Sequence, residues 1–285
     1  MSDKRNAAMD EYWNGAGGQN WMSHRNHLEE GLKNFAQRVI SAAAPASNEH
    51  ILDVGFGCGE TSIELAQLVG SNGRVHGVDI SAPMTKEAQL KAEAKGLANL
   101  SFESGDAQTM SLPKAEYDLA FSRFGVMFFD DFVGAFRNIL TSLKPDGRLV
   151  FMCWAKRSEN NWLALPLKIA AKHLTLPKPP EGPEAPGPFA LSNEERVSGI
   201  LGEAGFSDIN IEVFRTQVVL GADLDEALSF LMELSPLGGL IKQAEADGHS
   251  TTALIAELSE HLEAHEGEAG IALDGAALAV SAIKN

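Results

Sequence analysis

The segment ILDVGFGCGETSIELA, residues 51–66, joins an apolar run, an aspartate, three glycines at intervals of two and a helical pattern. A glycine-rich turn between a strand and a helix lets a ligand come close to the backbone. Gly55, Gly57 and Gly59 do not match the dinucleotide fingerprint, whose third glycine stands where this chain has Glu60. No Lys-Ser or Lys-Thr pair closes the segment, so it is not a triphosphate loop either.

Acidic side chains flank this loop. Asp53 ends the expected strand and Glu60 opens the expected helix, and both would repel a pyrophosphate at the helix N-terminus. Asp79 and Asp106 stand near the carboxyl ends of the next two expected strands. Open α/β sheets bind ligands at the carboxyl ends of their strands. Each aspartate alone could be a helix cap. Together they indicate a site for a ligand that carries positive charge and no phosphate.

Strands and helices alternate from about residue 49 to residue 154, which is typical of a parallel sheet covered on both faces. We expect strands at 51–53, 74–81, 100–107, 117–125 and 147–154. We expect the helices between them to end at residue 69, to span 83–95 and to span 132–143, and we expect a turn at 144–147.

The pattern D-V-G-x-G-x-G of residues 53–59, at the end of the first strand, resembles motif I of the class I S-adenosylmethionine-dependent methyltransferases. The segment KPDGRLVF, residues 144–151, resembles the one before the fifth strand of that family. The resemblance covers residues 48–154, and the chain looks like the type 11 or quinone-biosynthesis-like branch. It implies an α/β fold with a Rossmann-like sheet of seven strands, the last one antiparallel, and helical cap insertions.

The resemblance also implies S-adenosyl-L-methionine as cofactor and a role for each matching residue. Asp79 corresponds to the acidic residue that accepts hydrogen bonds from the ribose hydroxyls, and residues 105–107 correspond to the segment that borders the adenine. Ile80 and Met84 look like the apolar contacts on the adenine faces. The cofactor-binding residues expected are Asp53, Gly55, Gly57, Gly59, Asp79, Ile80, Met84, Gly105, Asp106, Ala107, Ser122 and Trp21.

Outside the matched segment, composition divides the chain. We expect a helical arm or lid at 1–47, the cofactor-binding core at 48–154, a cap insertion with a proline-rich loop at 155–192, and completion of the sheet at 193–285 with inserted helices at 222–266. In the arm, Tyr12, Trp13 and Trp21 stand among glycines. That arrangement suits a lid that excludes water, or an arm that aromatic side chains merely pin to the body.

The methyl acceptor would lie beyond the fourth and fifth strands. Candidates for its wall, which could equally be core packing, are Arg123, Phe124, Met127, Phe128, Phe129, Trp154 and Trp162. Arg123 needs a partner, which could be an acidic group of the acceptor, the methionine carboxylate of the cofactor or a neighbour such as Asp130. His24, His27 and His173 could face the acceptor as bases. Arg123 and these histidines are the catalytic candidates, and no residue is assigned a catalytic role.

The composition limits the partners. A formal net charge of −16 argues against nucleic acid. No apolar run approaches the ~18 residues of a membrane span and the N-terminus is polar, so we expect a cytoplasmic protein. An oligomer is compatible with this composition. Cys58 and Cys153 form no C-x-x-C pair and should stay reduced. His261 and His265 lack the glutamate of a zinc protease motif, and we expect no metal site.

The leading hypothesis is S-adenosylmethionine-dependent methyl transfer, by in-line displacement, to an O, N or C atom of a small, partly apolar molecule. An NAD(P)-dependent oxidoreductase is a second hypothesis, opposed by Glu60 and by the lack of a Tyr-x-x-x-Lys pair. A third is a non-catalytic protein that binds S-adenosylmethionine or S-adenosylhomocysteine.

Overall fold

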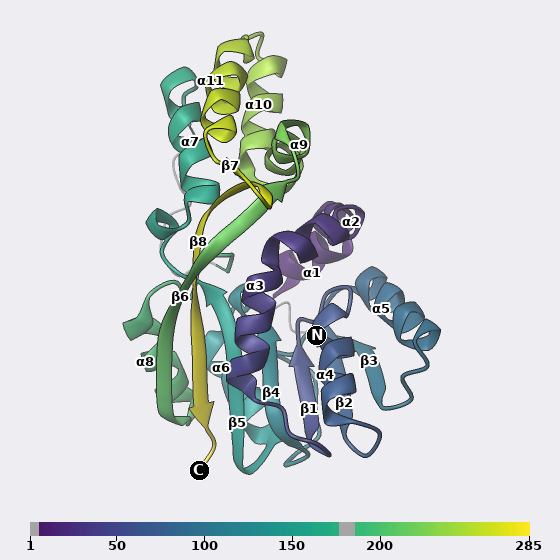
Figure 1. The fold of residues 1–285 in the computed structure, drawn as a ribbon. Helices are drawn as coiled ribbons and strands as arrows, with labels where there is room; N and C mark the ends of the chain where they lie inside the picture. Colours follow the sequence, from purple (N-terminus) through teal and green to yellow (C-terminus); the bar gives the residue numbers. More distant parts are fainter. Residues whose placement is uncertain (1–5, 177–185) are drawn as a thin grey trace.

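The structure, a computed structural model, describes residues 6–176 and 186–285. Its centre is one mixed sheet with the strand order β3-β2-β1-β4-β5-β8-β6 (Figure 1). The strands are β1 (His50–Val54), β2 (Arg74–Asp79), β3 (Leu100–Ser104), β4 (Tyr117–Arg123), β5 (Leu143–Trp154), β6 (Ser207–Gly221) and β8 (Gly270–Ile283). β8 is antiparallel to both of its neighbours, β5 and β6. This confirms the expected fold: a Rossmann-like sheet of seven strands whose last strand is antiparallel.

Helices cover both faces of this sheet, as the alternation predicts. The helices around it are α3 (Arg25–Ala43), α4 (Glu60–Val69), α5 (Ala82–Ala94), α6 (Phe132–Ser142) and α8 (Glu194–Ala204). α3 and α4 lie on one face, and α6 and α8 pack together on the other (Figure 1). β1, β4 and residues 149–154 of β5 are largely apolar and almost wholly buried because both of their faces are covered.

The start of β5 differs from the prediction. The segment at 144–147, expected to be a turn before the strand, lies within β5, which begins at Leu143. Pairing with β4 jumps from Tyr117 opposite Leu143 to Leu119 opposite Arg148, so the extra residues form a bulge. Asp146 within it has a left-handed backbone, φ 61°, as a turn residue would. Another strand that the sequence did not indicate is β7 (Glu266–Gly267), which pairs with β8.

The N-terminal region, for which we expected a helical arm or lid, folds into separate helices. α1 (Ala7–Asn14) and α2 (Ala16–Ser23) precede α3 and are separated from each other by Gly15. We call residues 6–23 the arm. Figure 1 shows the arm beyond the upper end of the sheet, between α5 and the end of α3. This end carries the C-termini of β1 and β4, where the sequence placed the ligand site.

β6 and β8 continue beyond the rest of the sheet. Their pairing runs on to Gly221 opposite Ile271, well past the last pair of β5 and β8, Trp154 with Ala277. The extended part carries a group of helices that we call the cap (Figure 1). The cap consists of α7 (Asn161–His173), α9 (Leu224–Leu234), α10 (Pro236–Ala246) and α11 (Thr252–Glu263), and the last three lie between β6 and β8 in the chain. The proline-rich segment lies outside the described residues except for 186–188.

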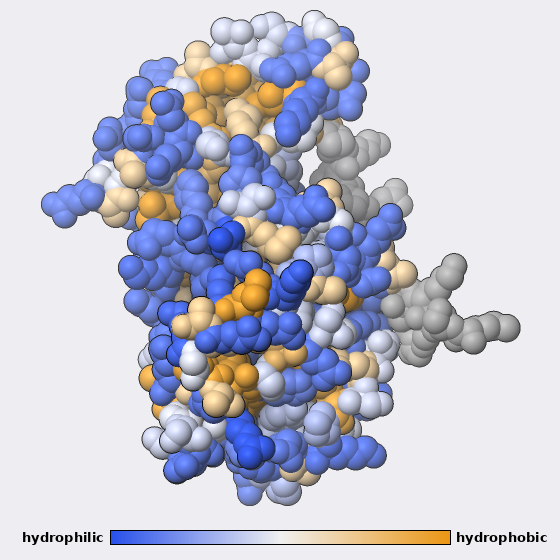
Figure 2. Space-filling view, turned by 90° about the vertical axis from the view of Figure 1, so that its right-hand side faces the viewer, coloured by the Kyte–Doolittle hydropathy of each residue, from blue (hydrophilic) through white to orange (hydrophobic). Residues whose placement is uncertain are grey.

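The surface is mostly hydrophilic on the face that Figure 2 presents, with apolar residues in small patches. Among the described residues, the large hydrophobic side chains that are exposed are Tyr12, Leu68 and Leu90. The apolar content of the chain is therefore largely used in the core around the sheet. In the ranges 6–176 and 186–285, no helix is both long and apolar enough to span a bilayer.

Candidate functional site

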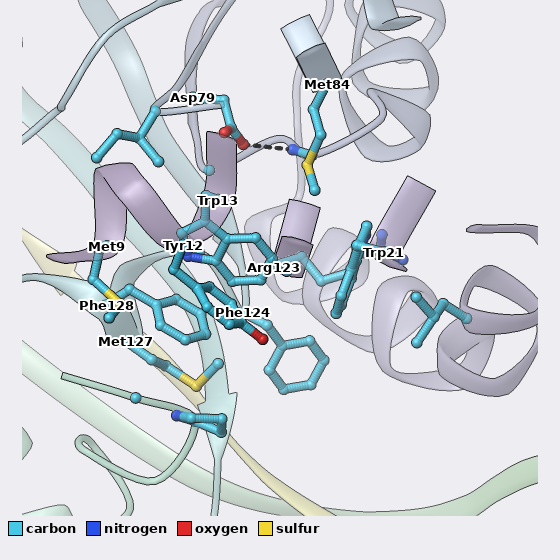
Figure 3. Close-up of a pocket in the computed structure, with 18 of the residues that line it drawn as sticks. Met9, Tyr12, Trp13, Trp21, Asp79, Met84, Arg123, Phe124, Met127 and Phe128 are labelled. Atoms are coloured by element: carbon cyan, nitrogen blue, oxygen red, sulfur yellow. Dashed lines mark hydrogen bonds between the residues drawn. The ribbon is translucent and has the colours of Figure 1, made fainter. Parts of the chain in front are cut away.

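A cavity of about 480 Å³ lies at the carboxyl ends of β1, β2 and β4. The glycine loop and the segment after β3 form one side, and the arm, α3 and the cap contribute the rest. Figure 3 shows Asp79 and Met84 on one side of it, and Met127, Phe124 and Phe128 on the other. The cavity thus has an acidic side and an aromatic side, as the sequence suggested.

The three glycines of the loop have left-handed φ angles, 73° at Gly55, 59° at Gly57 and 88° at Gly59, and they serve different purposes. A Cβ on Gly55 would lie 2.6 Å from Gly125 Cα, and one on Gly59 would lie 2.9 Å from Ala88 Cβ. A Cβ on Gly57 would meet only the Trp21 indole nitrogen, at 3.8 Å. Gly57 therefore leaves space for a ligand, whereas Gly59 permits packing and is not part of the cavity lining.

Asp79 joins the end of β2 to the glycine loop. Its carboxylate accepts hydrogen bonds from the backbone N–H groups of Gly57 and Ser81, both at 2.8 Å, and Figure 3 draws one hydrogen bond to this carboxylate. The residue is 8% exposed and lines the cavity. Burial raises the pKa of Asp79 to about 6, although both backbone hydrogen bonds act in the opposite direction. Each oxygen keeps a second lone pair, with which it can accept from a ligand.

The segment after β3 places Asp106 at the same wall. Its carboxylate accepts from the Gln108 N–H at 3.0 Å and from the Thr109 hydroxyl at 3.2 Å. The side-chain NH2 group of Asn6, in the arm, donates to it at 3.3 Å. The side-chain oxygen of Asn6, Oδ1, is buried without a partner. Gly105, Ala107, Ile80 and Met84 complete this part of the lining.

Two expected cofactor residues, Asp53 and Ser122, lie beneath the loop and do not line the cavity. Asp53 is fully buried and accepts from the Ser62 hydroxyl at 2.5 Å, but its Oδ1 atom has no partner. Burial raises the pKa of Asp53 to about 6. The Ser122 hydroxyl donates to the Val54 carbonyl at 2.7 Å, so it joins β4 to β1. The geometry therefore gives Ser122 a structural task.

Side chains of the arm close the cavity over the acidic side. Asn14 donates to the Ile80 carbonyl at 3.0 Å and accepts from the Ala82 N–H at 2.9 Å. The Ser81 hydroxyl donates to the Trp13 carbonyl at 2.9 Å. These bonds fix the arm to the segment that follows Asp79. Tyr12, Trp13 and Trp21, the aromatic residues singled out in the sequence, all line the cavity.

The aromatic side combines residues from β4, β5, the cap and the arm. Phe124 stacks on Trp154 with ring centroids 4.3 Å apart, and Trp154 in turn contacts Trp162 of α7 at 5.2 Å. Trp13 of the arm meets Phe128 edge to face at 5.1 Å. All seven residues proposed for the acceptor wall line the cavity. Several are also buried in the core, so they serve both purposes.

Arg123 pairs with Glu29 of α3 and not with Asp130, the neighbouring residue that the sequence suggested. Its guanidinium group donates to both carboxylate oxygens of Glu29, and the Nη1–Oε2 distance is 2.6 Å. The Arg123 side chain is 9% exposed and that of Glu29 is 24% exposed. Burial favours the neutral form of Arg123, but the carboxylate of Glu29 outweighs it and raises the pKa of the guanidinium group. Both residues line the cavity.

The three candidate histidines are not in the cavity lining. His24 is paired with Glu233 of α9, and the ring nitrogen of His27 meets the Leu220 carbonyl. His173 pairs with Glu257 of α11 at 2.7 Å. All three join the cap to other elements or stabilise it internally. Their proposed role as bases that face the acceptor is therefore not supported.

Several lining residues escaped the sequence reasoning, among them Asn6, Glu29, Arg157 and Phe230. The sequence could have indicated Glu29, because this charged residue stands beside Leu28 and Leu32 on the buried side of α3. Cys58 lines the cavity as a free thiol, and burial raises its pKa to about 11. Within the described residues, no three His, Cys, Asp or Glu side chains are grouped as a metal would require.

Comparison with known proteins identifies the central segment. A family model described as a methyltransferase domain matches residues 51–147. The aklanonic acid methyltransferase DauC of Streptomyces sp. (strain C5) is 36% identical over 117 residues, which are 41% of this chain and 53% of that protein. The ubiquinone/menaquinone biosynthesis C-methyltransferase UbiE of Pseudomonas aeruginosa is 33% identical over 123 residues, 43% of this chain and 48% of that protein.

The fold has a wider match than the sequence. The YcgJ protein of Bacillus subtilis superposes with a TM-score of 0.58, covering 88% of this chain and 97% of its own, at 18% identity. The likeness in fold thus covers 88% of this chain, whereas the two relatives match 41% and 43% of it in sequence. The chain spans about half the length of those relatives.

Proposed function

We propose that this protein is a class I S-adenosylmethionine-dependent methyltransferase that transfers a methyl group to a small, partly apolar molecule, because residues 51–147 match a methyltransferase domain. The acceptor atom is O, N or C, and the transfer is an in-line displacement. A small-molecule acceptor is supported by the two relatives, since DauC is an aklanonic acid methyltransferase and UbiE is a C-methyltransferase of ubiquinone and menaquinone biosynthesis. When bound, S-adenosylmethionine supplies an electrophilic methyl group on a sulfonium sulfur.

The observation that carries this proposal is the position of the Asp79 carboxylate beside the open backbone of Gly57, 2.8 Å away at the cavity wall. The pair fits an adenosine, because Asp79 can accept from two ribose hydroxyls where Gly57 leaves room. Asp106 and the unpartnered Asn6 oxygen fit an exocyclic adenine amine, and Met84 and Ile80 fit the adenine faces. Among the described residues that line the cavity, none on this side is basic, so a pyrophosphate would find no counter-charge from them.

The other end of the cofactor carries an ammonium and a carboxylate. The unpartnered Oδ1 atom of Asp53 gives negative charge beneath the loop, which favours a cation there. The proposed contribution of the chain to the reaction is alignment and exclusion of water. In this division of labour, residues 1–47 include the lid, 48–154 hold the cofactor, and 155–192 with the helices at 222–266 cover the acceptor.

We further propose a cytoplasmic protein with no nucleic-acid partner. Cys58 and Cys153 are both free and buried, which fits a reducing compartment. The formal net charge of −16 disfavours binding to phosphates. An oligomer is compatible with these features.

Incubation with methyl-labelled S-adenosylmethionine and a cell extract, followed by identification of the labelled product, tests the proposal. We expect label in a small molecule and S-adenosylhomocysteine as the co-product. Binding of the cofactor without any transfer would leave a non-catalytic binding protein. Failure to bind S-adenosylmethionine or S-adenosylhomocysteine would overturn the proposal altogether.

A further inference from the structure

The Glu29–Arg123 ion pair sits at the boundary between the two sides of the cavity. Arg123 ends β4, and the next residue, Phe124, begins the aromatic side with its stack on Trp154. Glu29 comes from the opposite element, α3, where Leu28 and Leu32 line the same cavity. The carboxylate is thus held among apolar side chains, at the place where a bound methyl donor and an acceptor would meet.

No other residue of the lining is as well placed to take a proton. The described lining residues include no histidine and no lysine. Asp79 and Asp106 belong to the acidic side, where we propose that they hold the adenosine, and burial raises the pKa of the Cys58 thiol to about 11. The hydroxyl of Tyr12 belongs to a side chain that is 52% exposed. The Glu29 carboxylate remains, and each of its oxygens has a second lone pair beyond its bond to Arg123.

We propose that Glu29 is the catalytic base of the methyl transfer, that Arg123 positions it, and that the acceptor is an uncharged, fused-ring phenol. This inference rests on the proposed function. The phenol hydroxyl donates a hydrogen bond to Glu29 while the rings pack against the aromatic side, near Phe124 and Trp154. As the oxygen forms its bond to the methyl carbon, the carbon–sulfur bond breaks and its electron pair stays on sulfur. The hydroxyl proton passes to Glu29, which leaves a methyl ether and neutral S-adenosylhomocysteine.

The charges of the lining favour an uncharged acceptor. Glu29 already neutralises Arg123, with a bidentate geometry that fits a carboxylate. An acceptor carboxylate near Glu29 would therefore meet like charge, whereas a hydroxyl donor would meet an acceptor.

2-Naphthol is a suitable probe because it has fused rings, one hydroxyl and no charge. The first measurement is the melting temperature with and without S-adenosylhomocysteine, which tests cofactor binding alone. The second is the Kd of 2-naphthol in the presence of S-adenosylhomocysteine, followed by its fluorescence. The third is transfer of a labelled methyl group from S-adenosylmethionine to 2-naphthol. We expect the wild-type protein to be positive in all three.

Glu29→Gln should lower kcat by roughly 10²–10⁴-fold, the usual contribution of a general base. It should also weaken 2-naphthol binding and leave the temperature shift by S-adenosylhomocysteine intact. Since this change leaves Arg123 without its counter-charge, the double variant Glu29→Gln/Arg123→Met gives the same test without a buried unpaired charge. Glu30→Gln is the matched control, because Glu30 is the next residue of α3 and its side chain is 67% exposed; it should behave as wild type.

The outcomes separate the two proposals. No temperature shift with S-adenosylhomocysteine in the wild type would overturn the proposed function itself. A shift without binding or methylation of 2-naphthol would overturn the acceptor class. Wild-type turnover and 2-naphthol affinity in the folded double variant would show that the ion pair is only structural and would overturn the role of Glu29.

Discussion

At the scale of single residues, the two oxygens of Asp79 each hold one backbone amide and face the cavity with what remains of their lone pairs. Asp79→Asn keeps the shape but removes the charge and one acceptor. We expect it to weaken binding of S-adenosylhomocysteine by about 1–3 kcal/mol, because the ribose hydroxyls lose a charged partner. Isothermal titration calorimetry measures the change in Kd.

Glu103→Gln provides the control for this measurement. Glu103 belongs to β3, next to β2, and its exposed side chain pairs with His76 at 3.3 Å rather than with the cavity. Its Kd for S-adenosylhomocysteine should equal that of the wild type. An unchanged Kd for Asp79→Asn would mean that Asp79 only shapes the loop.

Asp53 gives a prediction about pH. Burial raises its pKa from an ordinary 3.8 to about 6 in the folded protein, so between these values the folded state holds a proton that the unfolded state has lost. The contribution of the protonated Asp53 to the free energy of unfolding is present below about pH 4 and is lost as the pH rises through about 6. Asp53→Asn should therefore be more stable than the wild type by about 1–3 kcal/mol near pH 8, and the difference should vanish near pH 4.

Urea unfolding of both proteins across that pH range measures the difference directly, since the other titrating groups are common to both. Ser62 can still donate to the amide oxygen of the variant, so its hydrogen bond need not be lost. A difference in the free energy of unfolding that does not change with pH would contradict the account of Asp53.

The sequence located best those residues whose position relative to a strand of the sheet is fixed. Asp79 and Asp106 could be placed because each follows a strand of a parallel sheet. Gly59 and Ser122 were also expected to bind the cofactor, but their neighbours across the fold, Ala88 and Val54, give them packing and strand-joining tasks. The partner of Arg123 could not be found from its neighbours, because Glu29 is 94 residues away.

At the scale of elements, the arm depends on few bonds to the core. Asn14 alone makes two of them, to Ile80 and Ala82. Asn14→Ala should loosen the arm, because each lost hydrogen bond contributes about 0.5–1.5 kcal/mol. Hydrogen exchange of residues 7–23 should accelerate roughly tenfold while exchange in β1 and β4 is unchanged.

Asn34→Ala is a suitable control for the arm. Asn34 lies in α3, outside the arm, and makes one exposed bond to Thr216 at 3.1 Å. In the Asn34→Ala variant, hydrogen exchange of residues 7–23 should be as fast as in the wild type. If Asn14→Ala also left that exchange unchanged, the arm would be held by its aromatic side chains alone.

The elements that the sequence predicted well have strong local signals. α4, α6 and α8 combine helical spacing with clear ends, for example the Asn193 cap and Gly205 at the two ends of α8. α1 and α2 are short and polar, and Gly15 separates them. No periodic pattern in the sequence therefore distinguishes these two helices from a loop. The bulge in β5 is set by pairing with β4, which no local pattern reports.

At the scale of the whole molecule, the alternation of strands and helices predicted the sheet, and the family resemblance implied its antiparallel last strand. The resemblance stops near residue 154, so the helices inserted between the last two strands were expected from the sequence pattern alone, and nothing in that pattern indicated that β6 and β8 run past the rest of the sheet. The cavity is assembled from three regions distant in the sequence: the arm, the core and the cap.

The central claim is that this cavity binds S-adenosylmethionine through the acidic side, and the melting temperature with different ligands tests it most directly. At about 100 times its Kd, a ligand stabilises the folded state by about 2.7 kcal/mol, which should raise the melting temperature by roughly 5–10 °C. S-Adenosylhomocysteine should produce this rise, the rise should be smaller in Asp79→Asn, and NADH should have no effect. A rise with NADH and none with S-adenosylhomocysteine would contradict the account.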